Sequence, residues 1–171
     1  MYYSFIMKFT RLNKYQAIVL VAIFTWVLPF NLAAADDTLP IYSKTYDPKR
    51  DPIQDGIAAL KLAQETNRHV LIEVGGDWCA WCHRLDKFLR ADQQLYTDFF
   101  NTFVLVKVNV SEENDNKEFL KVFPPAKGYP HMYVTDKNGS IIESKDTADF
   151  LVNKRYSVVK FYEFINKWKA K

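Results

Sequence analysis

Hydrophobic residues recur every three or four positions along parts of the chain, which is the spacing of an amphipathic helix. Segments with this spacing lie at 51–67, 79–92, 116–123 and 157–169. Asp51 and Pro52 suit the cap and the first turn of the first helix, and Pro124-Pro125 closes the third. The pattern therefore predicts four helices.

Other segments have the short apolar runs or the alternation that predict β-strands. "HVLIEVGG" (69–76) is an apolar run that ends in two glycines, and "TFVLVKVNV" (102–110) alternates and is rich in β-branched residues. Residues 131–144 predict a hairpin whose turn is Asn138-Gly139. The order is helix, strand, helix, strand, helix, strand, strand, helix. This order predicts an α/β sandwich with a central mixed sheet.

The first 35 residues follow a different pattern. Three basic residues precede the apolar run Ala17 to Phe30, and "NLAAADD" follows it. A basic region, an apolar stretch and small residues are typical of a secretory signal peptide, which we expect to be cut after Ala35. The run falls short of the ~20 apolar residues of a membrane span, which favours cleavage over a retained anchor. Residues 36–50 are then an extended polar segment before one domain at 51–171.

Removal of this leader changes the net charge. The whole chain has 23 Lys and Arg against 20 Asp and Glu, and residues 1–35 hold three of the cations and none of the acids. The mature chain is therefore formally neutral. Electrostatics give no reason to expect binding to nucleic acid or to an anionic surface.

The only two cysteines, Cys79 and Cys82, lie in "WCAWCH". A lone pair this close indicates chemistry rather than architecture, because so short a loop adds little stability. The segment fits C-x-x-C-H, the attachment pattern of a c-type haem, and also the C-x-x-C of a thiol–disulfide exchange enzyme. Haem would need an axial partner to His83, and the candidate Met132 lies in a predicted strand. The position between a predicted strand and a predicted helix favours the redox dithiol.

Three landmarks in residues 55–170 resemble the thioredoxin superfamily. They are a strand before W-C-x-x-C, here "VLIEVGGDWCAWC", an acid six residues before the first cysteine, here Glu73, and "KGYPHMYVTDKNGSII". The last is similar to the family's cis-proline, strand and Asn-Gly hairpin, with Pro130 as the proline. The resemblance implies a thioredoxin-like three-layer sandwich. Ala80-Trp81 and His131 depart from thioredoxin, which leaves the direction of electron flow and the role of His131 open.

The resemblance also implies roles for the cysteines and the acid. Cys79 would be the nucleophile, because the start of a helix can lower a cysteine pKa from ~8.5 to as little as ~3.5. Cys82 would then resolve the mixed disulfide. Glu73, on a strand of valine, leucine and isoleucine, would have its pKa raised by burial and take the proton from Cys82. The alternatives are a static structural disulfide and a surface glutamate.

Residues around the dithiol are candidates for contacting a client protein: Trp78, Trp81, Tyr129 and Pro130. We expect Trp78 to pack beside the site and Trp81 to be the more exposed of the two. The backbone of Tyr129, before a cis-proline, would pair with an extended client. His83 could favour the thiolate, although a solvated histidine on the helix face is the simpler interpretation.

The sequence thus predicts an exported, monomeric thiol–disulfide oxidoreductase, periplasmic or secreted, or membrane-anchored if the leader is retained. Its substrates would be protein thiols or disulfides, and the reductase direction, recharged by a membrane electron donor, is preferred. It would need no cofactor beyond its dithiol, and no metal site is indicated, since no second paired motif accompanies the cysteines. The rival is a binding module that holds clients through Trp81 and Tyr129 without turnover.

Overall fold

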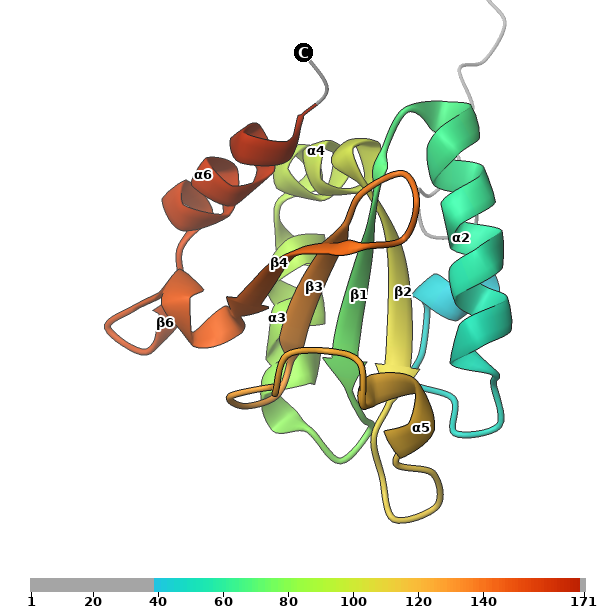
Figure 1. The fold of residues 1–171 in the computed structure, drawn as a ribbon. Coiled ribbons are helices and arrows are strands. Elements are labelled where there is room, and N and C mark those ends of the chain that lie inside the picture. Colours follow the sequence, from blue (N-terminus) through green and yellow to red (C-terminus); the bar gives the residue numbers. More distant parts are fainter. Residues whose placement is uncertain (1–38, 170–171) are drawn as a thin grey trace, which may run out of the picture. The chain divides into compact units, whose positions relative to one another are not determined.

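A computed structural model of the chain describes residues 39–169, which form a four-stranded mixed sheet between two layers of helices (Figure 1). The predicted signal peptide at 1–35 lies outside the described residues. No helix within 39–169 is long and apolar enough to cross a membrane.

The sheet confirms the predicted mixed arrangement. One central strand pairs in parallel with its neighbour at the edge of the sheet. On its other side it pairs antiparallel with the first strand of the hairpin, and the two hairpin strands are antiparallel to each other. Gly139 adopts a φ of +85° in the turn of that hairpin, where a side chain would be strained. In sheet order the strands are β2 (Phe103–Asn109), β1 (His69–Gly75), β3 (His131–Thr135) and β4 (Ile141–Asp146).

The four predicted helices are all present. Asp51 caps the first through its side chain, which accepts hydrogen bonds from the backbone N–H groups of Ile53 at 2.8 Å and Gln54 at 3.4 Å. Ser157 caps the last in the same way. The helices are α2 (Pro52–Thr66), α3 (Ala80–Ala91), α5 (Lys117–Leu120) and α6 (Val158–Trp168).

Three further features were not predicted from the sequence. Helix α4 (Gln93–Thr102) follows α3 without a break, because Asp92 ends one helix and caps the next. Before α6, a 3-10 turn, η2 (Thr147–Phe150), leads into a small hairpin of β5 (Leu151–Val152) and β6 (Arg155–Tyr156). Tyr156 of this hairpin packs against Trp81, which lies between the two cysteines.

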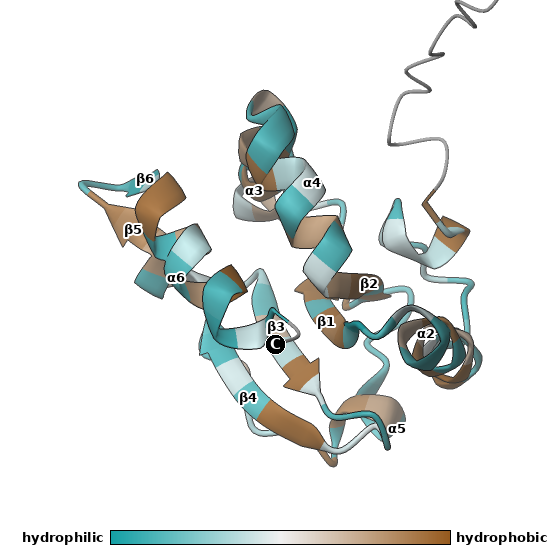
Figure 2. Cartoon of the chain, turned by 90° about the horizontal axis from the view of Figure 1, so that it is seen from above, coloured by the Kyte–Doolittle hydropathy of each residue, from teal (hydrophilic) through white to brown (hydrophobic). Residues whose placement is uncertain are grey.

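The two faces of the sheet bury different sets of side chains. Helices α3, α4 and α6 cover one face, where Leu71, Leu105 and Met132 point, and α2 covers the other, where Val70, Ile72 and Val74 point. Figure 2 shows α3 and α4 on the opposite side of the strands from α2 and α5. Strand β1 is buried on both faces, which explains its nearly continuous apolar sequence.

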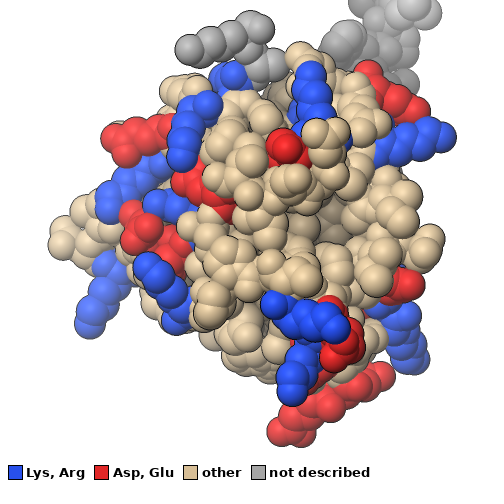
Figure 3. Space-filling model, viewed as in Figure 1, with Lys and Arg blue, Asp and Glu red and all other residues tan. Residues whose placement is uncertain are grey.

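The face under α2 is incompletely covered. A groove of about 400 Å³ runs between α2, α5 and the β3–β4 hairpin. Ile53 and Ile57, which contribute to the helical spacing of α2, are 54% and 58% exposed at its edge, while Ala59 and Ala63 make the buried contact. The face of the molecule in Figure 3 has a hollow lined by uncharged atoms, with cations and anions interspersed around it.

Residues 39–50 pack more closely than the predicted extended segment would. They contain a 3-10 turn, η1 (Ile41–Ser43), beside the edge strand β2. The Ser43 hydroxyl donates a hydrogen bond to the carbonyl oxygen of Leu105. Tyr42 and Tyr46 are only 7% and 3% exposed, so both anchor the segment in the domain. The segment thereby covers part of an otherwise open sheet edge.

Candidate active site

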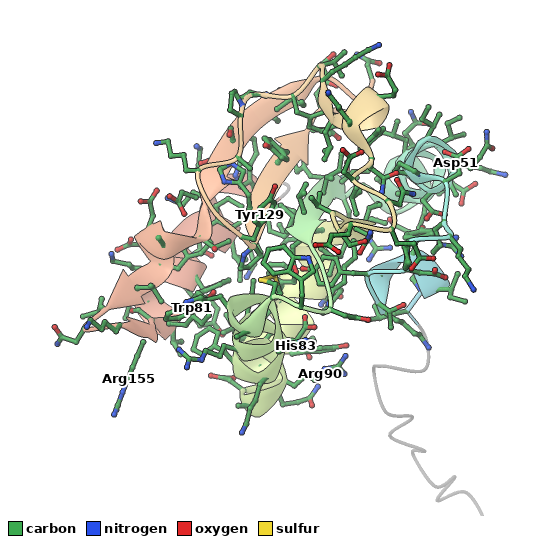
Figure 4. All side chains as sticks on the ribbon, turned by 90° about the horizontal axis from the view of Figure 1, so that it is seen from below. Asp51, Trp81, His83, Arg90, Tyr129 and Arg155 are labelled. Atoms are coloured by element: carbon green, nitrogen blue, oxygen red, sulfur yellow. A yellow bond between two sulfur atoms is a disulfide. The ribbon has the colours of Figure 1, made fainter. Side chains whose placement is uncertain are left out.

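The two cysteines form a disulfide at the start of α3. Cys79 is the N-cap residue, and its Sγ accepts a hydrogen bond from the backbone N–H of Cys82 at 3.1 Å. Cys79 is 4% exposed and Cys82 is fully buried. After reduction, the same N–H and the positive end of the helix would stabilise a thiolate on Cys79. Figure 4 shows Trp81, His83 and Tyr129 around this end of α3.

Glu73 lies on the face of β1 that α3 covers, and it is fully buried. Its Oε1 accepts a hydrogen bond from the Tyr46 hydroxyl, and its Oε2 has no hydrogen-bond partner. Burial raises the pKa of Glu73 to about 7, while Lys107 and the Tyr46 hydrogen bond act in the opposite direction. The burial and raised pKa expected from the sequence are therefore present. Near neutral pH this carboxyl can both accept and release a proton.

Lys107 stands directly opposite Glu73 in the parallel register of β1 and β2. Its Nζ lies 2.7 Å from Oδ1 and 2.6 Å from Oδ2 of Asp86, and 4.9 Å from the centroid of the Tyr46 ring. Asp86 is one helical turn after Cys82 on α3, so it faces the same space. The lysine charge is compensated by Asp86, which leaves Glu73 with a tyrosine rather than a cation as its hydrogen-bond partner.

The Tyr129–Pro130 peptide bond is cis, as the resemblance implied. Pro130 is buried, and its carbonyl oxygen accepts a hydrogen bond from Thr147 Oγ1 at 2.6 Å. A groove of about 270 Å³ lies beside this bond. Its lining combines aromatic, aliphatic and charged residues: Trp81, Lys127, Gly128, Tyr129, Pro130, Asp146, Thr147, Ala148, Leu151 and Tyr156.

The two tryptophans are exposed in the opposite order to that predicted. Trp78 is 59% exposed, although its Nε1 donates a hydrogen bond to the Val110 carbonyl at 2.7 Å and its ring packs edge-on against Tyr129. Trp81 is half-buried because its ring packs edge-on against Tyr156 of β6. The prediction was wrong because the β5–β6 hairpin, which covers Trp81, was not anticipated.

The side chains of His83 and His131 have partners other than the two cysteines. His83 is exposed on α3, and its Nε2 lies 2.7 Å from the Asp77 carbonyl oxygen, to which it donates. His131 is buried, and burial lowers its pKa. In the sheet it pairs with Val74 and stacks near Tyr133, both on the α2 side. The residue after the cis-proline therefore points away from the cysteines.

Residues 51–137 match the sequence model of a protein family described as thioredoxin-like. The chain belongs to the thioredoxin-like family. With a C-x-x-C disulfide at the start of a helix, this membership identifies it as a thiol–disulfide oxidoreductase. It also favours the redox interpretation of "CAWCH" over haem attachment. Within residues 39–169, no cluster of three or more His, Cys, Asp or Glu could hold a metal ion.

Two solved structures share the fold of the chain. A disulphide isomerase from Xylella fastidiosa Temecula1 is 27% identical with a TM-score of 0.60, covering 75% of this chain and 95% of its own. The C-terminal domain of DsbD from Neisseria meningitidis, in its oxidised form, is 17% identical with a TM-score of 0.51. That match covers 70% of this chain and 97% of the domain. No curated protein sequence matches the chain.

Three polar residues of the thioredoxin-like site were missed from the sequence. Lys107 interrupts the apolar strand "VLVKV", and a lysine at a core-facing strand position could have indicated a buried charge. Asp86 follows Cys82 by four residues, a spacing that places both on one helix face. Tyr46 carries no local signal, since only the packing of its segment brings it to Glu73.

Proposed function

We propose that the protein is an exported oxidoreductase that exchanges disulfides with other proteins, and that it works as a monomer in the reductase direction. The observation that most supports the exchange chemistry is the arrangement of three groups around the start of α3. Cys79 lies at the helix end, Cys82 is buried behind it, and Glu73 is buried with a pKa of about 7. A purely structural disulfide has no need of a buried, proton-exchanging acid.

In the proposed reaction, the Cys79 thiolate attacks a client disulfide, forms a mixed disulfide and releases one client sulfur as a thiolate. The Cys82 sulfur then attacks Cys79, which breaks the bond to the client and passes the electron pair to the second client sulfur. Cys82 loses its proton in this step, and Glu73 receives it. The client ends as a dithiol and the protein as the Cys79–Cys82 disulfide, so a reductant must restore the dithiol.

The groove beside the cis bond supports a protein client rather than a small molecule. The backbone of Tyr129 borders the groove, and a backbone next to a cis-proline can pair with an extended peptide. Trp78, at 59% exposure and packed edge-on against Tyr129, offers a further apolar contact beside the groove. The similar structure of a disulphide isomerase from Xylella fastidiosa agrees with protein substrates.

The enzymatic proposal and the client-binding alternative differ in turnover. The mature chain should accelerate the reduction of insulin by dithiothreitol, and a Cys79→Ser, Cys82→Ser variant should not. Equal activity of the two proteins would favour a binding module. Equilibration with glutathione tests the direction, and we expect a potential nearer to the ~-270 mV of thioredoxin than to the ~-120 mV of the strongest periplasmic oxidant.

Export is proposed from the leader sequence alone. Mass spectrometry of the protein recovered from the producing cell should find Asp36 or a near neighbour at the N-terminus, because the small residues before it suit signal peptidase. Residues 36–50 would then stay with the domain. Recovery of an intact N-terminus in the membrane fraction would instead establish a retained anchor, with the same domain facing the exported side.

A further inference from the structure

The segment before α2 supplies a side chain to the redox site. Tyr46 lies outside residues 51–137, which match the thioredoxin-like family, and it is 3% exposed. Its ring packs with Cys79 and Cys82, and its hydroxyl donates a hydrogen bond to Glu73. One tyrosine therefore contacts both the dithiol and the buried acid.

Gly75 leaves the space in which the tyrosine meets the buried cysteine. A Cβ atom at this position would stand 2.6 Å from Cys82 Sγ and 3.0 Å from Tyr46 Oη. Both atoms thus border the same small volume, and residue 75 has no side chain to separate them. The Tyr46 hydroxyl, which is hydrogen-bonded to Glu73 Oε1, and Cys82 Sγ therefore both line the space beside Gly75.

We infer that the Tyr46 hydroxyl relays the proton between Cys82 and Glu73, an inference that rests on the proposed exchange reaction. As Cys82 attacks the mixed disulfide, its thiol proton passes to Tyr46 Oη while the hydroxyl proton passes to Glu73 Oε1. The tyrosine ends with the same number of protons as it began with. In the reverse direction, protonated Glu73 returns the proton to the Cys82 thiolate by the same route.

The charges around Tyr46 favour a concerted transfer over an ionised tyrosine. The titratable and charged groups that face it are Glu73 on β1, Lys107 on β2, Asp86 on α3 and Tyr156 on β6. Burial and the neighbouring Glu73 raise the pKa of Tyr46 well above its ordinary value. The hydroxyl therefore accepts one proton as it gives up the other. Lys107 is a poorer relay, because its Nζ is engaged by both oxygens of Asp86.

The relay can be tested by the rate at which Cys82 releases a preformed mixed disulfide. Cys79 is first loaded with a 5-thio-2-nitrobenzoate group, and release of the coloured thiolate is followed in a single turnover across the pH range. Tyr46→Phe keeps the ring and removes only the hydroxyl. We expect release to slow by about tenfold near neutral pH, and the difference from the unmodified rate to shrink as pH rises and the buried Cys82 thiol begins to ionise unaided.

Two further variants separate a relay from a structural role. Glu73→Gln should slow release in the same pH range, and the double variant should be no slower than the slower single variant, because both changes break one route. Tyr42→Phe is the matched control, since Tyr42 is buried in the same segment but packs on the α2 side of the sheet. It should leave the rate and its pH profile unchanged.

The outcomes distinguish this inference from the proposed function. The relay would be overturned if Tyr46→Phe released the label at the unmodified rate. It would also be overturned if the double variant were slowed by the product of the two single effects. Equal slowing at every pH would also overturn it, because a displaced cysteine would be slow whether or not it is ionised. Failure of the unmodified protein to release the label or to reduce insulin would count against the exchange reaction itself.

Discussion

Cys82→Ser should accumulate client proteins on Cys79 as covalent mixed disulfides, while Cys79→Ser should trap almost none. Cys79 lies at the helix start, where its thiolate is stabilised, whereas Cys82 has no exposed surface with which to meet a client. Without Cys82, the first attack proceeds and the second cannot occur. Both variants should lose turnover of insulin by on the order of a thousandfold or more, because each removes a sulfur that reacts.

Non-reducing gels of protein expressed in its own compartment would show the adducts, and dithiothreitol should disperse them. His83→Ser serves as a matched control, since His83 lies on the same helix, is exposed, and its ring donates a hydrogen bond to the Asp77 carbonyl. It should neither trap clients nor lose turnover. Equal trapping by the two cysteine variants would contradict the division of roles, and trapping by neither would contradict exchange with proteins.

Glu73→Gln should change how the free energy of unfolding depends on pH. In the folded protein the pKa of Glu73 is about 7, against an ordinary value of 4.5. At pH values below the ordinary pKa, the carboxyl is protonated in both the folded and the unfolded protein, so its titration does not change the free energy of unfolding. Between the two values the unfolded chain ionises while the folded chain keeps its proton, so stability falls as pH rises. Above the folded value the loss is complete, at roughly 3 kcal/mol.

Glutamine stays neutral at every pH. The free energy of unfolding of Glu73→Gln, relative to that of the unmodified protein, should therefore rise by about 3 kcal/mol between about pH 4.5 and pH 8. Urea unfolding of the oxidised proteins across this range measures the difference. Contributions from other titrating groups, such as the buried His131, are common to both proteins and cancel. Glu118→Gln, at an exposed position on α5, should show no comparable trend. A pH-independent difference at position 73 would contradict the raised pKa.

The buried carboxyl of Glu73 lowers the stability of the fold but serves the proposed chemistry. An apolar residue at position 73 would suit the core between β1 and α3 and would remove the cost of burying a carboxyl. The same carboxyl, with a pKa near neutrality, is the group that can exchange a proton with Cys82. The folded protein thus loses stability at position 73 because the proposed chemistry requires an ionisable group there, and such a trade-off is common at active sites.

The sequence by itself determined the features that depend on neighbouring residues. Caps such as Asp51 and Ser157 act within one helical turn, the turn glycine Gly139 acts within its hairpin, and the helical and strand periods need only a short window. The place of the cysteines at a helix start followed from the same local patterns, and the apolar strand around Glu73 favoured burial of this residue over a surface position. A resemblance in three ordered motifs then supplied the fold and the cis bond at Pro130.

Only the tertiary structure decided which distant side chains surround the dithiol. Tyr46 is 27 residues from Glu73, and the Lys107 ion pair with Asp86 joins residues 21 apart. Trp81 and Tyr156, 75 residues apart, meet because of a hairpin too short to leave a clear pattern. Such contacts depend on how helices and strands pack across the sheet rather than on any local preference. Local periods can place a residue on a face, but packing alone selects the partner that it meets there.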